Sequence, residues 1–361
     1  MNRFFVFPVL AILASACQSA PDVQYKTVFG NTHAHCNYSG DIAKFKAKKG
    51  LQLDPKNTVD NHYRIAKENG YDFYCVTDHS QYPEYTLEAW ADVKAKADAF
   101  TDDTFVGLRG YEHSENDGPD GTGHMNVYNS SMFLNALADS VSIEFLHDWL
   151  ARPENEDVIV GFNHPAKDAY NDFHCYNEGA RDNFKIIELI NWSKPRFYPS
   201  FLNALSKGWK VSPVAGCDNH GWEGISKWPC RTGLLVTELS QDGVLDAMAH
   251  RRTYATLDKN LEISYTVNRK IMGSDIEKAD KYRFDISVNE PDSGKEDQVI
   301  TKIEIVTDGG EVVASSEFQD YNVEWRPVIE DTGKDYYFIL VYNASRQDGP
   351  IAFVAPVWIE R

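Results

Sequence analysis

Residues 26–35 read KTVFGNTHAH, a short apolar run that ends in two histidines. Apolar or β-branched runs of similar length recur six times, in YDFYCVTDHS (71–80), TFVGLRGYEHS (104–114), HMNVYNS (124–130), DVIVGFNHP (157–165), FKIIELINW (184–192) and KVSPVAGCDNH (210–220). Runs of this length between polar segments are typical of buried strands. The polar pairs HAH, DH, EH, NH and DNH follow the apolar parts, so they mark the carboxyl ends of the predicted strands.

Amphipathic segments lie between these runs and predict helices at 59–70, 85–100, 142–153 and 242–252. Strands that alternate with helices imply a mainly parallel sheet, and about seven such units suggest a TIM-like (β/α)7 barrel. Active sites of such barrels lie at the carboxyl ends of the strands. The segment after the two N-terminal histidines, NYSGD, is expected to be a short polar loop.

The pattern changes after Asp258. Segments such as LEISYTV (261–267), YRFDISV (282–288) and DYYFILVYN (335–343) alternate or run apolar at strand length, separated by turn residues. They predict a small β-sandwich over residues 259–361, preceded by an α/β barrel over residues 27–258. No histidine occurs beyond His250, so the chemistry is expected in the barrel.

The N-terminus predicts export. A basic residue, Arg3, precedes an apolar run from Phe4 to Ala16 that ends in small residues, as in a signal peptide over residues 1–16. ASA before Cys17 satisfies an A-x-A cleavage rule, whereas LASAC also resembles a lipoprotein box. The second interpretation makes the protein a membrane-anchored lipoprotein attached through acylated Cys17, facing the periplasm or the cell exterior, with residues 17–26 as a linker.

Charge and cysteine content narrow the function classes further. The 361-residue chain has a net charge of −18, which argues against a nucleic-acid partner because phosphates require a basic face. Five cysteines follow Cys17, an odd number for an oxidising compartment, and the sequence leaves a disulfide between Cys175 and Cys230 open. The oligomeric state is not indicated by the sequence.

The strand ends supply one set of polar residues. It contains His33, His35, Asp41, Asp78, His79, Glu112, His124, His164, Asp218 and His220. Imidazoles with carboxylates are the ligands of zinc, manganese or iron rather than of calcium. One ion needs three or four protein ligands, so the set fits two or three divalent ions, with Glu112 as the candidate bridge.

These motifs carry a family resemblance. HAHCNYSGD, VTDHS, GYEHS, NHP and GCDNH, in this order, resemble the polymerase and histidinol phosphatase (PHP) superfamily of metal-dependent phosphoesterases over about residues 28–258. The segment LLVTELSQDGVLDAMAHRRTYATLDKNLEISYTVNRKIMG (234–273) and the region after it resemble the exported branch that includes the bacterial carbaryl hydrolases. The resemblance implies the metal-holding PHP form of the barrel.

The resemblance also implies a division of the ligands among three ions. His33, His35 and Asp218 hold the first ion with Glu112 bridging, and Glu112, His124 and His164 hold the second. His79, His220 and Asp41 form the third site, which is looser or absent if the order SGD, where many members read SDG, displaces Asp41. Asp78 is expected to orient an imidazole, and Glu112, Asp78 and His220 are expected to take part in catalysis.

The expected reaction is hydrolysis of a small-molecule phosphomonoester or phosphodiester by metal-bound hydroxide. No G-x-S-x-G elbow and no P-loop motif is present, so a protein nucleophile is not indicated. Lys167, Lys194 and Arg196 are candidates for binding the phosphate. Two alternatives stay open: a carbamate or carboxylic ester hydrolase that uses the same metals, and a ligand-binding lipoprotein without turnover.

Several residues remain outside these assignments. His62, His147 and His250 lie in predicted helices among charged residues, so we expect them at the surface. His113 has two interpretations, facing the metals or the opposite side of its strand, and His174 is left open. Trp192, Trp222 and Tyr170 have two interpretations as well, a pocket floor or core.

Overall fold

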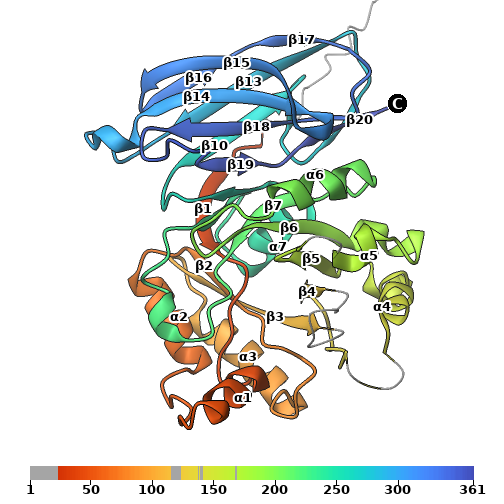
Figure 1. Cartoon of the computed structure of the whole chain (residues 1–361), viewed down its shortest axis with the longest axis vertical. Helices are drawn as coiled ribbons and strands as arrows, with labels where there is room; N and C mark the ends of the chain where they lie inside the picture. Colours follow the sequence, from red (N-terminus) through yellow and green to blue (C-terminus); the bar gives the residue numbers. More distant parts are fainter. Residues whose placement is uncertain (1–22, 115–122, 137, 139–140, 167–168) are drawn as a thin grey trace, which may run out of the picture.

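The computed structural model describes residues 23–114, 123–136, 138, 141–166 and 169–361 (Figure 1). The predicted signal peptide, Cys17 and Lys167 lie outside the described residues. Within the described part, no helix is both long enough and apolar enough to cross a membrane.

The first two thirds of the chain contribute a row of strands to a large mixed sheet. They are β1 (Lys26–Asn31), β2 (Phe73–Val76), β3 (Val106–Ser114), β4 (His124–Tyr128), β5 (Ile159–Asn163), β6 (Phe184–Asn191), β7 (Ser212–Gly216), β8 (Arg231–Val236) and β9 (Thr253–Thr256). Their order is β9-β8-β1-β2-β3-β4-β5-β6-β7. The pairs β1–β2, β2–β3, β5–β6 and β6–β7 are parallel, whereas β4 runs antiparallel to both neighbours and β8 antiparallel to β1. The sheet is therefore less uniformly parallel than the sequence predicts.

The row of strands curls until its last strand returns to the first ones. The backbone N–H of Asp218 donates to the carbonyl of His33 at 2.9 Å, and that of Cys217 donates to Oδ1 of Asn31 at 2.8 Å. The N–H of Ala215 donates to Oγ1 of Thr232 in β8 at 2.8 Å. Residues after β1 and β7 are thereby brought together although they lie far apart in the sequence.

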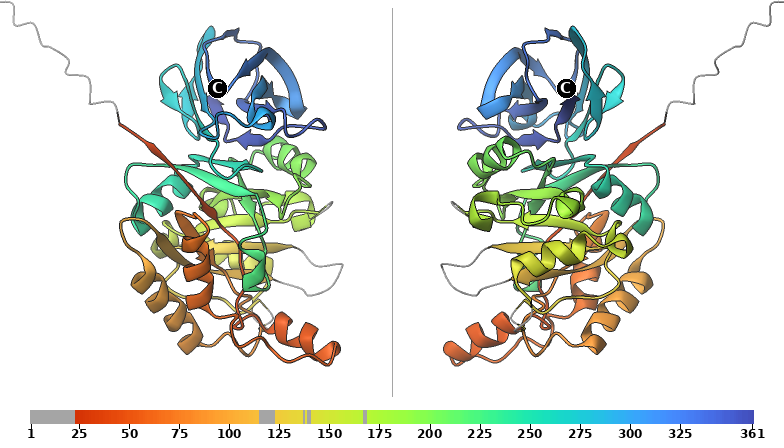
Figure 2. Two further views of the ribbon diagram at one scale, coloured as in Figure 1. Left: turned by 90° about the vertical axis from the view of Figure 1, so that its left-hand side faces the viewer. Right: turned by 90° about the vertical axis from the view of Figure 1, so that its right-hand side faces the viewer.

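Helices lie outside these strands (Figure 2). They are α1 (Gly40–Lys48), α2 (Val59–Glu68), α3 (Leu87–Phe100), α4 (Ile143–Leu150), α5 (Ala169–Phe173), α6 (Tyr198–Ser206) and α7 (Gln241–Ala249). The four predicted helices correspond to α2, α3, α4 and α7, and each begins after a Thr or Ser whose side chain accepts a backbone N–H from the first turn. The expected loop at NYSGD covers only its first three residues, because α1 begins at Gly40 and carries Asp41 in its first turn.

Two histidines expected at the surface are buried. His62 in α2 is 0% exposed and His147 in α4 is 2% exposed. His62 lies on the buried stripe with Val59 and Ile65, at the helical spacing that places side chains on one face. The prediction followed the charged neighbours in sequence, but the helical period decides which side chains point inward. His250, at the end of α7, is exposed as expected.

The last part of the described chain is all β (Figure 1). Its strands are β10 (Glu262–Val267), β11 (Lys270–Ile271), β12 (Asp275–Glu277), β13 (Lys281–Asn289), β14 (Ile300–Thr307), β15 (Glu311–Asp320), β16 (Asn322–Trp325), β17 (Val328–Glu330), β18 (Tyr336–Asn343), β19 (Ala352–Val354) and β20 (Val357–Glu360). One sheet has the order β11-β10-β13-β16, and β17 also pairs with β13. The strands β12-β20-β18-β19 extend the large sheet, which they join by the pairing of β19 with β9. In the same sheet, β14 pairs with both β15 and β18. Ile263, Ile286, Ile303 and Ile339 from the two sheets belong to one buried apolar cluster.

Candidate metal centre

The predicted site residues converge at one edge of the curled sheet. His33 and His35 follow β1, His79 follows β2, and Asp218 follows β7. His124 is the first residue of β4, but β4 is antiparallel, so its start pairs with Ser114 and Asn163 at the ends of β3 and β5. The reversed strand explains why a residue at a strand start joins residues at strand ends.

Glu112 in β3 lies at the centre of this group and is 0% exposed. Five imidazole nitrogens lie 3.0–3.3 Å from its carboxylate oxygens, those of His33, His35, His79, His124 and His164. The side-chain amide of Asn163 donates to Oε1 at 2.8 Å, which fixes the carboxylate. Glu112 is therefore the carboxylate around which these histidines gather, and its role as a bridge between ions stays a prediction.

The three residues expected around a first ion lie together. Nε2 of His33 and Nε2 of His35 are 3.0 Å apart, and both lie within 3.5 Å of Oδ1 of Asp218. Their donor atoms all lie within 4.8 Å of one another, as do those of three further groups in this cluster. For the expected second set, Nδ1 of His124 and Nε2 of His164 lie 3.2 and 3.3 Å from Oε1 of Glu112.

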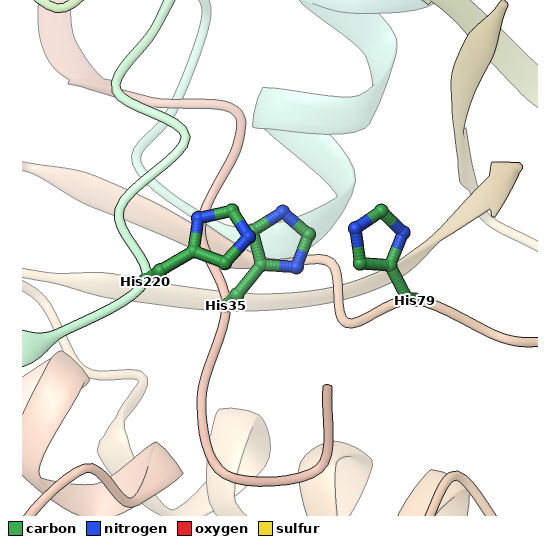
Figure 3. A group of neighbouring side chains, drawn as sticks. All are labelled: His35, His79 and His220. Atoms are coloured by element: carbon green, nitrogen blue, oxygen red, sulfur yellow. The ribbon is translucent and has the colours of Figure 1, made fainter. Parts of the chain in front are cut away.

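The expected third set is also close, with His35 between its two histidines (Figure 3). The ring of His35 lies 4.6 Å from that of His79 and 4.2 Å from that of His220, and these three donors form one of the four groups. Oδ2 of Asp41 lies 2.7 Å from Nε2 of His220 and 3.8 Å from Nε2 of His79. The structure therefore brings Asp41 to the centre despite the order SGD.

The electrostatics of the centre suit cations. Burial alone would lower the pKa of His35, but the neighbouring carboxylates of Asp218 and Glu112 outweigh it and raise the pKa to about 10. Burial alone would raise the pKa of Glu112, but the neighbouring His79, His33 and His124 lower it well below its ordinary value. The carboxylates therefore create a strongly negative potential among nitrogen donors.

Hydrogen bonding supports the same interpretation. Oε2 of Glu112 has no hydrogen-bond partner among the described residues, although nitrogens of His35 and His79 lie 3.3 and 3.0 Å from it. Oδ1 of Asp41 is likewise buried without a partner among the residues described. Buried carboxylate oxygens that lack a hydrogen bond beside several imidazole nitrogens fit a shared cation, and imidazole with carboxylate fits zinc, manganese or iron.

Glu188 in β6 belongs to this centre and was not predicted. Its Oε2 lies 3.4 Å from Nδ1 of His33 and accepts the backbone N–H of His164 at 2.8 Å, while Oε1 accepts the amide of Asn191 at 2.9 Å. A Cβ on Gly216 would lie 2.3 Å from Oε1, so the glycine leaves room for this carboxylate. A single carboxylate inside the apolar run FKIIELIN was the sequence signal that could have found it, because a buried charge needs a partner.

Asp78 contacts the donor cluster indirectly, through hydrogen bonds with Cys36 and Ser39. It is 0% exposed and accepts hydrogen bonds from the backbone N–H of Cys36 at 2.7 Å and from its Sγ at 3.0 Å. The Ser39 hydroxyl bonds to Asp78 and lies 2.8 Å from Nδ1 of His35. Asp78 thus supports the loop that carries His35, and the direct imidazole contact expected from the sequence is replaced by Ser39.

The described basic residues that were proposed for substrate binding, Lys194 and Arg196, lie at the surface rather than in the buried donor cluster. Lys194 is exposed, and Arg196 borders a hollow formed with Pro165, Phe173 and Ser200. Lys227, which was not predicted, lines a hollow of about 350 Å³ together with Asp218 and His220. Substrate-binding side chains sit on loops, so local sequence patterns do not reveal which loops reach the centre.

The three aromatic candidates differ in whether they lie in the core or beside the open hollow. Tyr170 is buried, and its hydroxyl donates to the backbone carbonyls of His124 and Asn163, so it belongs to the core. Nε1 of Trp222 donates to Asp54 at 2.8 Å. Trp192 is 40% exposed and lines the same hollow as Asp218 and His220.

The remaining open residues lie outside the donor cluster. His113 is 0% exposed, and the alternation of side chains along a strand places it on the opposite side of β3 from Glu112. His174 is exposed and packs edge-on against Tyr176. Sγ of Cys230 lies 3.3 Å from Sγ of Cys217, and both thiols are free, as is Cys175.

No family model and no curated protein matches this chain. Eight solved chains resemble it in structure. One is a two-domain protein from Bacteroides vulgatus that contains a predicted PHP-like metal-dependent phosphoesterase, with 14% identity, a TM-score of 0.48, and coverage of 94% of this chain and 98% of that chain. PsfC from Pseudomonas syringae has 18% identity, a TM-score of 0.36, and coverage of 58% and 82%. The lesion-specific endonuclease PfuEndoQ from Pyrococcus furiosus has 12% identity, a TM-score of 0.41, and coverage of 62% and 56%.

Proposed function

We propose that this protein is a metal-dependent phosphoesterase of the PHP superfamily. The observation that carries the proposal is the convergence of five imidazoles on the buried carboxylate of Glu112. A purely structural core would not gather this many polar donors, because each buried polar group without a hydrogen bond is destabilising. The motif order that resembles the PHP superfamily supports the same assignment.

The positions of the donor residues suggest which of them would hold each ion. His33, His35 and Asp218 would hold one ion and His124 and His164 a second, with Glu112 between them. His79, His220 and Asp41 would hold a third. Divalent ions in these places would lower the pKa of a bound water and neutralise the charge that develops on the phosphoryl oxygens.

Residues of the second layer keep these donors in place. Glu188 faces Nδ1 of His33, and Ser39 faces Nδ1 of His35, so each imidazole presents its Nε2 to the centre. Partners of this kind fix the tautomer and the ring orientation of metal-binding histidines. Asp218 and His220 also border the open hollow, so a substrate would approach from that side.

The proposal extends to architecture and location. Residues 27–258 would form a distorted TIM-like (β/α)7 PHP barrel in which β4 is the reversed element, and residues 259–361 would form a β-sandwich. The N-terminal segment would direct export, and acylated Cys17 would anchor the protein to a membrane. The ions would be zinc, manganese or iron.

Glu112→Gln tests the site. The substitution keeps the shape of the side chain and removes its charge, so we expect loss of bound metal by elemental analysis and loss of phosphatase activity. Glu290→Gln is the matched control, because Glu290 is also a buried carboxyl but follows β13 in the C-terminal region. Full activity of Glu112→Gln would overturn the proposed centre.

Parallel assays separate the reaction classes. The metal-loaded protein would be offered phenyl phosphate, bis(phenyl) phosphate and a phenyl carbamate under identical conditions. Phosphoester hydrolysis that exceeds carbamate hydrolysis supports the proposal, whereas a dominant carbamate rate would favour an acyl-ester hydrolase. Metal content without turnover of any ester would favour a ligand-binding protein.

A further inference from the structure

Three neighbouring strands end in residues with an unusual backbone. His164 directly after β5, Trp192 directly after β6 and Asp218 shortly after β7 have φ angles of 30°, 58° and 46°. Positive φ is uncommon outside glycine, and for a bulky residue it is a real outlier. His164 and Asp218 belong to the donor cluster, so Trp192 occupies the equivalent rim position with an indole instead of a ligand.

The backbone at Trp192 is held by its surroundings. Its N–H donates to the carbonyl of Gly216 in β7 at 3.3 Å, and Asn191 before it pairs with Lys194. Strained backbone of this kind persists where the surrounding structure imposes it, and it concentrates at functional sites. Trp192 is strained and 40% exposed, so packing in the core contributes little to the stability of its conformation. This combination suggests that the indole contacts a bound ligand.

Trp192 has an aromatic partner. Its indole stacks on that of Trp228 with the ring centroids 5.8 Å apart and the planes at 10°. Nε1 of Trp228 donates to Oδ1 of Asn219, next to Asp218, at 3.1 Å. The two indoles therefore form one pair of nearly parallel aromatic rings, and the hydrogen bond of Trp228 ties this pair to the loop that carries Asp218.

This surface borders the metal centre directly. Trp192, Trp228, Asp218, His220 and Lys227 line one hollow of about 350 Å³ that is open to solvent. A ligand in the hollow would contact the indoles while a group attached to it reached the donors of Asp218 and His220. The exposed side chains of Lys227 and Glu223 place one positive and one negative charge at the rim of the hollow.

We propose that Trp192 and Trp228 form a subsite for a planar aromatic group of the substrate, and that the substrate class is phosphate esters of aromatic alcohols. The inference rests on the proposed phosphoesterase function and specifies its substrate. In the reaction, water supplies the oxygen of the new P–O bond, the bond between phosphorus and the aryl oxygen breaks, and the leaving alcohol receives a proton. Stacking against the indoles holds the aryl group beside the metal centre.

The test uses two non-hydrolysable probes with six-membered rings, the planar aromatic phenylphosphonate and the non-planar saturated cyclohexylphosphonate, at a pH where both phosphonates are fully ionised. Their dissociation constants are measured by calorimetry on the metal-loaded full chain. We expect the wild type to prefer phenylphosphonate by about tenfold, in the range of single aromatic stacking contacts. Trp192→Leu should remove this preference, and Trp192→Phe should retain most of it.

Trp325→Leu is the matched control, because it removes a partly buried tryptophan from β16 in the other sheet. We expect it to keep the wild-type preference. Metal content is measured in every variant, so that loss of the centre is not mistaken for loss of the subsite. If Trp192→Leu does not fold, Trp228→Leu carries the same expectation.

A preference that survives in Trp192→Leu, or equal weakening of both probes, would overturn the subsite. Ester hydrolysis by a wild type without aryl preference would refute this inference and leave the phosphoesterase proposal standing. The converse result, a Trp192-dependent preference for phenylphosphonate without turnover of any ester, would support the subsite and refute the phosphoesterase.

Discussion

His62 should make the protein less stable in mild acid. Its ring is completely buried in α2, and Nε2 donates to Oδ1 of Asn57 at 2.7 Å, while Nδ1 has no hydrogen-bond partner among the described residues. Burial, with a smaller contribution from the nearby His35 and His220, lowers the pKa of His62 from its ordinary value of 6.5 to about 3. The folded protein therefore excludes the charged form that the unfolded chain adopts.

The direction and size of the stability change follow from the difference between the pKa values of His62 in the folded and unfolded states. A depressed histidine pKa leaves stability intact above the unfolded value of 6.5, and stability falls as the pH drops from there toward the folded value. Each pH unit in that window corresponds to about 1.4 kcal/mol, so we expect a loss of about 2 kcal/mol between pH 8 and pH 5 from this residue. Below about pH 3 the contribution levels off.

The assay is urea unfolding of wild type, His62→Gln and His62→Leu at pH 8 and pH 5, with the same chelator throughout so that metal binding does not contribute. The two variants differ in packing and hydrogen bonding but share the loss of the titrating ring. Both should therefore lose about 2 kcal/mol less than wild type on acidification, whatever their stability at pH 8. Parallel pH dependence in all three proteins would refute the reasoning.

Three further predictions concern the metal centre. Glu188→Gln should weaken metal binding about tenfold or more, because the carboxylate no longer orients His33, and a competing chromogenic chelator would measure the change. Gly216→Ala should destabilise the fold by about 1–3 kcal/mol in urea unfolding, because a Cβ there would lie 2.3 Å from Oε1 of Glu188. Chelation should lower the melting temperature of wild type but not that of Glu112→Gln, since an ion that binds only the folded state stabilises it. Unchanged metal affinity of Glu188→Gln would contradict the first expectation, and unchanged stability of Gly216→Ala the second. An equal fall in melting temperature for wild type and Glu112→Gln on chelation would contradict the third.

Much of the candidate centre was predictable because its residues sit at the ends of locally recognisable strands. His33, His79 and His164 each follow an apolar run, and parallel neighbours bring such ends to one edge. Their convergence on Glu112 is what the pattern predicts.

Other features needed more than the local pattern. Glu188 looks like an ordinary charge until the curled sheet places it against His33. Helical periodicity could have predicted the burial of His62, because His62 lies on the same face of α2 as Val59 and Ile65. Its charged neighbours in the sequence favoured a surface position instead. The loop residue Lys227 reaches the hollow beside His220, whereas Lys194 does not line it.

The sequence by itself determined the alternation of strands and helices and the position of polar residues at strand ends, because both depend on neighbours a few residues apart. Only the tertiary structure decided that β4 runs backwards, that Asp41 joins the centre from α1, and that Trp192 stands exposed beside it. These features depend on contacts between segments far apart in the chain. The direction of a strand and the reach of a loop are set when the whole sheet closes, and no local period encodes them.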